Sequence, residues 1–166
     1  MVTPSEPLLK QKSQDMGAVR APSAKGAPQQ KKPQQVKPIE IIQQSIAKEM
    51  PDANPEQIIN TLWALVQRGA VKLVQIGNTV FSIMPKGGNT AEFHTFTIED
   101  PQVLVSRFKA GANTLKQMGF KQAVTYAESP AFVKMAQQTG LPVKISQGSQ
   151  KIGGQQKPVY QFILDL

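Results

Sequence analysis

Residues 115–145 read LKQMGFKQAVTYAESPAFVKMAQQTGLPVKI, and this stretch decides the predicted fold. A helix is expected to end at Gly119, because glycine adopts the left-handed conformation at low cost. The next run, KQAVTYA, has the composition of a strand, and Ser129-Pro130 then opens a short helix that Gly140 closes. PVKIS follows as another strand. This alternation of helix and strand predicts a layered α/β domain.

Two helices are expected further upstream. In the first, Ile39, Ile42 and Ile46 recur at helical spacing and predict a buried face. The second opens at Asn54, which caps free N–H groups and precedes a proline suited to the first helical position. Gln57 occupies the capping-box position of this helix. Its apolar residues predict a helix that is buried on a sheet.

Strands and one more helix separate these two parts of the chain. AVKLVQI and TVFSIM are expected to pair as strands, because Gly77-Asn78 between them is a hairpin signal. PKGGN is expected to be a loop and AEFHTFTI a third strand. Asp100-Pro101 then opens a helix. The residues expected to point inward from that helix are Val103, Leu104, Phe108, Ala112 and Leu115.

The C-terminal part completes the expected order. SQGSQKIGGQQK, residues 146–157, is predicted to be a long flexible loop, and PVYQFILDL a final strand. The order is then α-α-β-β-β-α-β-α-β-β, which predicts a three-layer α/β domain with a mixed sheet.

This order resembles the GNAT fold, the fold of the N-acetyltransferases, over residues 39–166. Local motifs of the second half support the resemblance: Gly119-Phe120, Glu128-Ser129-Pro130-Ala131 and Gly140-Leu141. It implies an acyl-CoA N-acyltransferase-like domain.

The resemblance also implies where the family's chemistry would lie, and two of its features are missing. The family's coenzyme loop is rich in glycine, and its successive N–H groups hold a pyrophosphate. Residues 98–103 read IEDPQV there, so proline removes a donor, and Glu99 and Asp100 would repel a diphosphate. The tyrosine that protonates the leaving thiolate has Ala136 in its place. Tyr126 extends from a strand and is a poor substitute.

His94 and Glu92 lie on the strand where the family sometimes keeps a general base. Because side chains alternate along a strand, the two share one face of the sheet. A catalytic His–Glu pair is one interpretation, and a satisfied, partly buried pair is the favoured one. His94 is the single histidine, and the chain has no cysteine. Multi-histidine metal centres, disulfides and thiolate metal sites are thereby excluded.

The net charge of +8 is unevenly distributed. Residues 1–38 hold seven basic against two acidic residues, whereas residues 39–166 hold twelve against nine. The first segment is rich in Pro, Gln, Lys and Ser and has no aromatic residue, so we expect an extended or disordered basic arm that orders on a partner. The arm residues expected to bind a partner are Leu8, Leu9, Lys10, Lys12, Arg20, Lys25, Lys31, Lys32 and Lys37. Lys151 and Lys157 in the predicted loop are expected to form a second contact.

These features favour a non-catalytic structural or assembly protein, similar to degenerate GNAT-like domains among the virion-associated proteins of tailed bacteriophages. That interpretation predicts no enzymatic activity, no catalytic residues, no cofactor and no metal. The expected partners are other virion proteins in a symmetric, multi-copy assembly, with non-specific contact to packaged DNA. No long apolar segment indicates a membrane span or a secretory signal. The expected location is the virion, after synthesis in the host cytoplasm.

Two other functions remain open. One is an N-acetyltransferase with a variant acetyl-CoA site. The other is a winged-helix-like DNA-binding protein, with residues 53–69 as its recognition helix and the Gly77-Asn78 hairpin as its wing. Arg68 is the only basic residue of that helix, which predicts weak phosphate anchoring.

Overall fold

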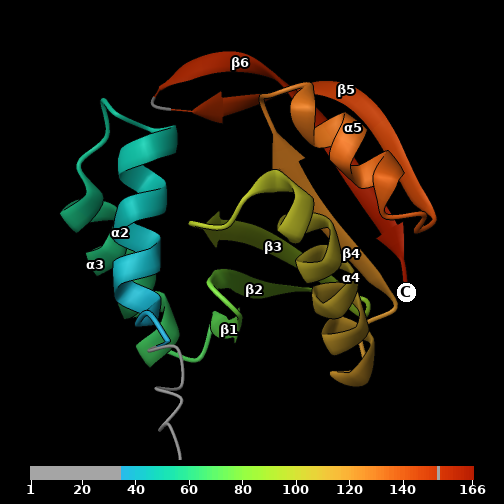
Figure 1. The fold of residues 1–166 in the computed structure, drawn as a ribbon, viewed down its shortest axis with the longest axis horizontal. Coiled ribbons are helices and arrows are strands. Elements are labelled where there is room, and N and C mark those ends of the chain that lie inside the picture. Colours follow the sequence, from blue (N-terminus) through green and yellow to red (C-terminus); the bar gives the residue numbers. More distant parts are fainter. Residues whose placement is uncertain (1–34, 153) are drawn as a thin grey trace, which may run out of the picture. The chain divides into compact units, whose positions relative to one another are not determined.

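The computed structural model describes residues 35–152 and 154–166, which form a mixed sheet with helices on both faces (Figure 1). The elements are α2 (Pro38–Glu49), α3 (Pro55–Gln67), β1 (Lys72–Ile76), β2 (Thr79–Gly87), β3 (Thr90–Thr97), α4 (Pro101–Gln117), β4 (Gln122–Ala127), α5 (Ala131–Gln138), β5 (Val143–Ile152) and β6 (Gln155–Asp165). The strand order is β1-β2-β3-β4-β6-β5. Only β3 and β4 pair in parallel within this sheet. The predicted three-layer α/β class with a mixed sheet is confirmed.

Helix α2 lies against β2 and β3. It begins at Pro38, one residue before the predicted start of the domain, and its buried residues are Ile41, Ile42, Ser45 and Ile46. The prediction that Ile39 belongs to this face is wrong, because Ile39 lies in the first turn and stays 46% exposed.

Helix α3 packs beside α2. The predicted cap is confirmed, since the Asn54 Oδ1 atom accepts hydrogen bonds from the N–H groups of Glu56 (3.0 Å) and Gln57 (3.4 Å). The prediction of a helix buried on a sheet is wrong in degree: no α3 residue is fully buried, and Trp63 is 53% exposed. Leu62 instead packs against the α2 cluster, together with Ile58 and Ile59 of the same helix.

Two hydrophobic clusters occupy the two faces of the sheet, because side chains alternate along each strand. On the first face, Val80 packs with the α2 isoleucines, and Leu73, Phe96 and Ile98 are partly buried against them. On the second face, Phe81 and Phe93 pack with α4 residues such as Leu115. The sheet is therefore covered by α2 on one face and by α4 and α5 on the other (Figure 1).

Helix α4 buries most of the residues that were predicted to face inward. Leu104, Ala112 and Leu115 are buried, and Phe108 packs against the same cluster. Val103 is 39% exposed, so the prediction for that residue is wrong.

The β1–β2 hairpin matches the predicted turn, whereas the β2–β3 hairpin differs from the predicted loop. Gly77, with φ of 61°, turns β1 into β2 as predicted. Because β2 also pairs with β3, this hairpin is part of the sheet and not a free wing. The predicted PKGGN loop is wrong in its first three residues, which extend β2 to Gly87.

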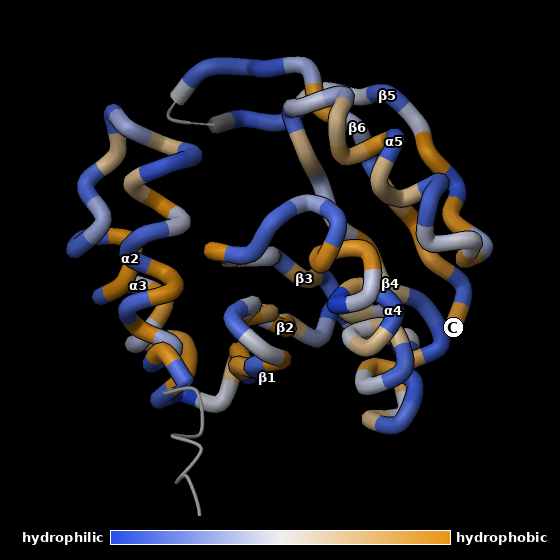
Figure 2. Tube along the Cα trace, viewed as in Figure 1, coloured by the Kyte–Doolittle hydropathy of each residue, from blue (hydrophilic) through white to orange (hydrophobic). Residues whose placement is uncertain are grey.

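The predicted flexible loop at residues 146–157 is also wrong. Its residues pair in register from Ser146 with Gln161 to Ile152 with Gln155, so the segment forms the far part of the β5–β6 hairpin. Figure 2 shows that this part is hydrophilic. Within residues 35–152 and 154–166, the helices are too short or too polar to cross a membrane.

Candidate functional site

The centre of the sheet opens between β3 and β4. Their parallel ladder has three residue pairs, from Thr90 with Gln122 to Glu92 with Val124. Beyond it, β3 continues to Thr97 alongside β2, and β4 continues to Ala127 alongside β6. Figure 1 shows the two strands diverging. The two strands therefore have facing edges that do not pair along their second halves.

Thr95 and Tyr126 present backbone groups to this gap. In an antiparallel ladder, successive residues direct N–H and C=O alternately to one side and to the other. Ile98 N–H donates to the Asn78 carbonyl, so even-numbered residues of β3 bond to β2 and Thr95 faces β4. Leu166 N–H donates to the Lys121 carbonyl, so by the same alternation Tyr126 faces β3. The gap is lined by backbone donors and acceptors.

A cavity of about 60 Å³ lies under the gap, on the face covered by α4 and α5. Phe93 of β3 and Thr125 of β4 line it from the sheet, and Phe108 and Phe132 line it from the helices. Ala136 also lines it. Space of this size exceeds that of one water molecule, and its lining is mainly apolar. It can hold a small apolar group.

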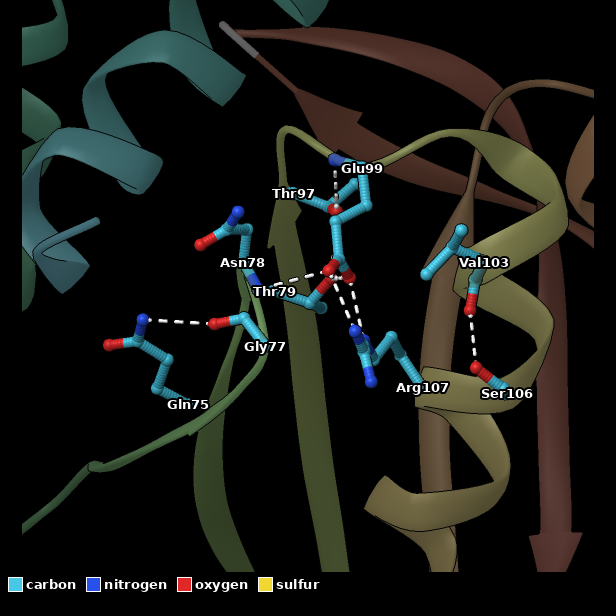
Figure 3. A network of polar contacts seen from close by, with 9 residues as sticks. All are labelled: Gln75, Gly77, Asn78, Thr79, Thr97, Glu99, Val103, Ser106 and Arg107. Atoms are coloured by element: carbon cyan, nitrogen blue, oxygen red, sulfur yellow. Dashed lines mark hydrogen bonds and ion pairs between the residues drawn. The ribbon is translucent and has the colours of Figure 1, made fainter. Parts of the chain in front are cut away.

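The turn between β3 and α4 is closed by an ion pair (Figure 3). Arg107 donates to both carboxylate oxygens of Glu99, from Nε at 2.8 Å and from Nη2 at 2.9 Å. The N–H of Asn78 and the hydroxyl of Thr79 also donate to Glu99, at 3.1 and 2.9 Å. A Cβ atom on Gly77 would lie 2.5 Å from Arg107, so the guanidinium covers this glycine closely. Through Glu99, these hydrogen bonds connect the β1–β2 hairpin to α4.

These partners keep Glu99 ionised. Hydrogen bonds from Arg107 are the largest cause that lowers the pKa of Glu99 from its ordinary 4.5 to about 2, against an opposing effect of burial. The Glu99 side chain is 11% exposed. Because the Glu99 charge is matched by Arg107, the predicted repulsion of a diphosphate by Glu99 is wrong. Asp100 remains an exposed acidic residue beside it.

The first turn of α4 leaves few donors for an anion. Pro101 has no N–H, and the N–H groups of Val103 and Leu104 both donate to the Asp100 carbonyl, at 3.0 and 3.1 Å. Asp100 has the predicted N-cap position, but its side chain makes no capping hydrogen bond. The glycine-rich cradle expected of a pyrophosphate loop is therefore replaced by a closed turn.

The opposite face of the sheet carries a polar cluster beside the gap. Glu92 contacts both Lys86 Nζ, at 2.9 Å, and His94 Nε2, at 3.3 Å. The hydrogen bond from Lys86 to Glu92 raises the pKa of Lys86. On β4, the Tyr126 hydroxyl accepts a hydrogen bond from Gln161 at 3.3 Å. The predicted sharing of one face by His94 and Glu92 is confirmed, although His94 is more exposed than a partly buried pair implies.

Comparison with known proteins identifies the fold. No protein-family model and no curated protein sequence match the chain. Solved structures do match it. One is a chimera of spermidine N-acetyltransferase SpeG from Vibrio cholerae and hSSAT, with 10% identity, 76% of this chain and 89% of that chain covered, and a TM-score of 0.56. Another is ribosomal-protein-alanine N-acetyltransferase from Brucella melitensis, with 9% identity, 77% and 91% covered, and a TM-score of 0.55. A third is the N-acetyltransferase RimL in complex with coenzyme A, with 14% identity, 77% and 88% covered, and a TM-score of 0.56.

The described chain has the GNAT N-acetyltransferase-like fold. The expectation that the chain is not an enzyme is contradicted by this comparison, because the matching structures are acetyltransferases. Two motifs of the family are missing, but the gap and its cavity are present in this domain without them.

Of the residues predicted to bind partners, Lys37, Lys151 and Lys157 lie in the described part of the chain. Leu8, Leu9, Lys10, Lys12, Arg20, Lys25, Lys31 and Lys32 lie outside the described residues. Lys37 is exposed at the N-cap position of α2. Lys151 pairs with Gln156 and Lys157 with Gln150, so the two lysines point to opposite faces of the β5–β6 hairpin. Lys157 lies 3.9 Å from Glu128. The virion partners and location stay predictions.

Sequence inspection missed the groups that define the gap. Thr95 and Tyr126 matter through their backbones, and no side-chain motif marks that role. The Glu99–Arg107 pair is separated by eight residues across a helix start, where no periodicity rule applies. Within the described residues, no cluster of three or more metal-binding side chains is present.

Proposed function

We propose that this chain is an N-acyltransferase that moves an acyl group from a pantetheine thioester, such as acetyl-CoA, to an amine. The observation that carries the proposal is the gap between β3 and β4, with its facing backbone groups and the apolar cavity beneath. The acetyltransferase-like fold supports it.

The gap fits the pantetheine part of such a donor. Pantetheine is an extended chain with two amides, and an extended chain can bond to a free strand edge as an added strand does. Thr95 on β3 and Tyr126 on β4 each offer one N–H and one C=O to it. The acyl end would then enter the cavity beside Phe108, Phe132 and Ala136. These residues would hold the donor and exclude water from its thioester.

His94 is the candidate proton acceptor. It precedes Thr95 on β3, on the face of the sheet opposite the cavity, so the amine would approach from that face. The contact of His94 Nε2 with Glu92 places the ring hydrogen on Nε2 and leaves Nδ1 free to accept a proton. The amine nitrogen forms a bond to the acyl carbon, the carbon–sulfur bond breaks, and Nδ1 takes the amine proton.

The departing sulfur has no acid beside it in the cavity. Ala136 lines the cavity at the position where the resemblance places a tyrosine, and the polar lining residues are threonines. A thiol has a pKa of about 8.5, so a thiolate can leave and take its proton from bulk water once it has left the cavity. Because an acid contributes roughly 10²–10⁴-fold in rate, we expect slow turnover.

A thiol-release assay tests the proposal. The full chain is mixed with acetyl-CoA and a panel of amines, including polyamines and peptides with free N-termini, and released thiol is detected by a colorimetric thiol reagent. The chain has no cysteine, so the protein gives no background. We expect amine-dependent thiol release and measurable heat on titration with acetyl-CoA. The proposal would be overturned if no amine gave thiol release and acetyl-CoA gave no heat of binding.

The matched variants are His94→Gln and Glu128→Gln. His94→Gln is expected to lower the rate by about 100-fold, within the usual range for a lost base, and to leave donor binding unchanged. Glu128 is exposed and its ion pair is with Lys157, not with Glu92 or His94, so its variant should keep the rate. Equal rates for His94→Gln and the unaltered chain would exclude His94 as the base.

A further inference from the structure

The start of α4 offers little to the diphosphate of a nucleotide-bearing donor. Binding a phosphate at a helix start depends on several free backbone N–H groups that point at the anion. Here the first helical residue is Pro101, and the N–H groups of Val103 and Leu104 are both directed at the Asp100 carbonyl. The bond of Leu104 is the first regular bond of the helix, so the N–H positions that this helix start could leave free are those of Pro101, Gln102 and Val103. Among these three, Gln102 alone has an N–H that is not directed at the Asp100 carbonyl.

The charges at this helix start are also unsuited to a diphosphate. Arg107 is the only basic residue in the segment PQVLVSRF that opens α4. Its Nε and Nη2 atoms are both directed at Glu99, and Gly77 lies directly against its guanidinium. Asp100 adds an exposed negative charge, and the side chain of Val103 is exposed where a close backbone approach would be needed.

The gap between β3 and β4 and the start of α4 therefore differ in the groups that they offer to a ligand. The gap has backbone donors and acceptors at Thr95 and Tyr126, whereas the helix start has a neutralised ion pair and an acidic residue. We infer that this chain recognises its donor through the acyl-pantetheine portion alone and leaves the nucleotide diphosphate without a binding site. The inference rests on the proposed N-acyltransferase function. Its substrate class is acyl-pantetheine thioesters, with or without a nucleotide.

Comparative calorimetry tests the inference. The full chain is titrated without amine, at 0.2 M salt, with acetyl-CoA and with acetyl-pantetheine, which lacks the nucleotide diphosphate. The salt limits contact between the phosphates and the basic arm. We expect dissociation constants within about threefold of each other, which is less than one tenfold step in affinity. Acetyl-CoA binding more than about tenfold tighter would overturn the inference and leave the proposed function standing. If neither ligand binds, the proposed function is overturned, and the inference with it.

Competition gives a second readout on the unaltered protein. Adenosine 3′-phosphate 5′-diphosphate, the nucleotide part of the coenzyme, is added to the acetyl-pantetheine titration. We expect no change in the apparent dissociation constant. Displacement of acetyl-pantetheine by the nucleotide would overturn the inference.

A gain-of-binding variant completes the design. Glu99→Gln removes the carboxylate that holds Arg107 and so frees a cation beside the start of α4. We expect acetyl-CoA to gain at least about threefold in affinity relative to acetyl-pantetheine in this variant. An equal change for both ligands would contradict the assignment of Arg107 as the cation that Glu99 withholds. If the variant does not fold, the competition experiment still decides the matter.

Discussion

The Glu99 carboxylate accepts four hydrogen bonds where the β1–β2 hairpin, the β3–α4 turn and α4 meet. It accepts from Asn78 and Thr79 at the β1–β2 hairpin, and from Arg107 on α4. Because the Thr79 hydroxyl donates to Glu99, its contact of 2.7 Å with Thr97 makes Thr97 the donor of that pair. One side chain thus fixes the position of α4 relative to the strand edge that borders the gap.

Glu99→Gln is expected to destabilise the fold. Glutamine has the same size but no negative charge, and a hydrogen bond to a charged group contributes about 1.5–3 kcal/mol. We expect the free energy of unfolding, measured by urea denaturation at pH 7, to fall by about 2 kcal/mol. Glu128→Gln is the control, because its exposed carboxylate lies 3.9 Å from Lys157 and should contribute less than about 1 kcal/mol. Equal effects of the two substitutions would contradict the role given to Glu99.

The same residue predicts a dependence of stability on pH. The pKa of Glu99 is about 2 in the folded chain and 4.5 ordinarily, so the unfolded chain binds more protons between these values. The stabilisation is therefore present above pH 4.5 and is lost as the pH falls towards 2. We expect the difference in unfolding free energy between the unaltered chain and Glu99→Gln to be constant from pH 7 to pH 5 and to shrink below pH 4.5. Urea titrations at several pH values measure it, and a constant difference down to pH 3 would contradict this prediction.

At this scale the sequence predicts local chemistry and little else. The Asn54 cap follows from rules that connect residues two or three positions apart. The shared face of Glu92 and His94 follows from the strand period. The Glu99–Arg107 pair forms because a turn brings the two residues together, and no local rule specifies that geometry. Because the sequence does not reveal this pair, the predicted repulsion of a diphosphate by Glu99 was wrong.

Among the elements, β3 carries the prediction that most directly tests the gap. Thr95→Pro removes an N–H that faces the gap and takes no part in the ladder with β2, a place where proline is tolerated in strands. We expect this variant to bind acetyl-pantetheine at least about tenfold more weakly in calorimetry, because one donor to the ligand is lost. Thr95→Ala keeps the N–H and should bind within about threefold of the unaltered chain.

Circular dichroism serves as the control for folding of both Thr95 variants. If Thr95→Pro is folded and binds as tightly as Thr95→Ala, the assignment of this edge to the donor is wrong.

The accuracy of the predicted elements depends on the source of their stability. Helices with caps and terminal glycines were predicted well, because those signals are local. The Gly, Ser and Gln of residues 146–157 predict a loop, because these residues are poor strand formers. Residues 146–152 and 155–157 form strands because they pair across the β5–β6 hairpin, and strand propensity depends strongly on such context.

For the whole molecule, the order of elements was enough to predict the fold class, because few topologies join these elements with short connections. The gap could not be predicted in the same way. The sequence indicates that β3 and β4 are strands, but the position where their ladder ends depends on how the two halves of the sheet twist apart. The candidate site is thus a property of the assembled sheet.

The net charge of +8 gives a prediction for the full chain. We expect weak binding to duplex DNA at low salt, without sequence preference, and its loss at about 0.2 M salt, because such binding depends on counterion release. Electrophoretic shift measures it. Substitution by glutamine of the basic arm residues should reduce the salt dependence; these are Lys10, Lys12, Arg20, Lys25, Lys31, Lys32 and Lys37. Sequence-selective binding that survives these substitutions would contradict the prediction and favour the DNA-binding alternative.

The short ladder between β3 and β4 gives the sheet an unpaired edge at its centre. Edges normally lie at the periphery of a sheet, where proteins protect them against pairing with other chains. Along β3, the amide hydrogen of His94 is bonded to β2, whereas that of Thr95 faces the gap. Deuterium should therefore enter alternate amides of one strand at very different rates. Slower exchange at Thr95 and Tyr126 on addition of a compound would identify occupants of the gap, whether they are small thioesters or an extended peptide that inserts as an additional strand.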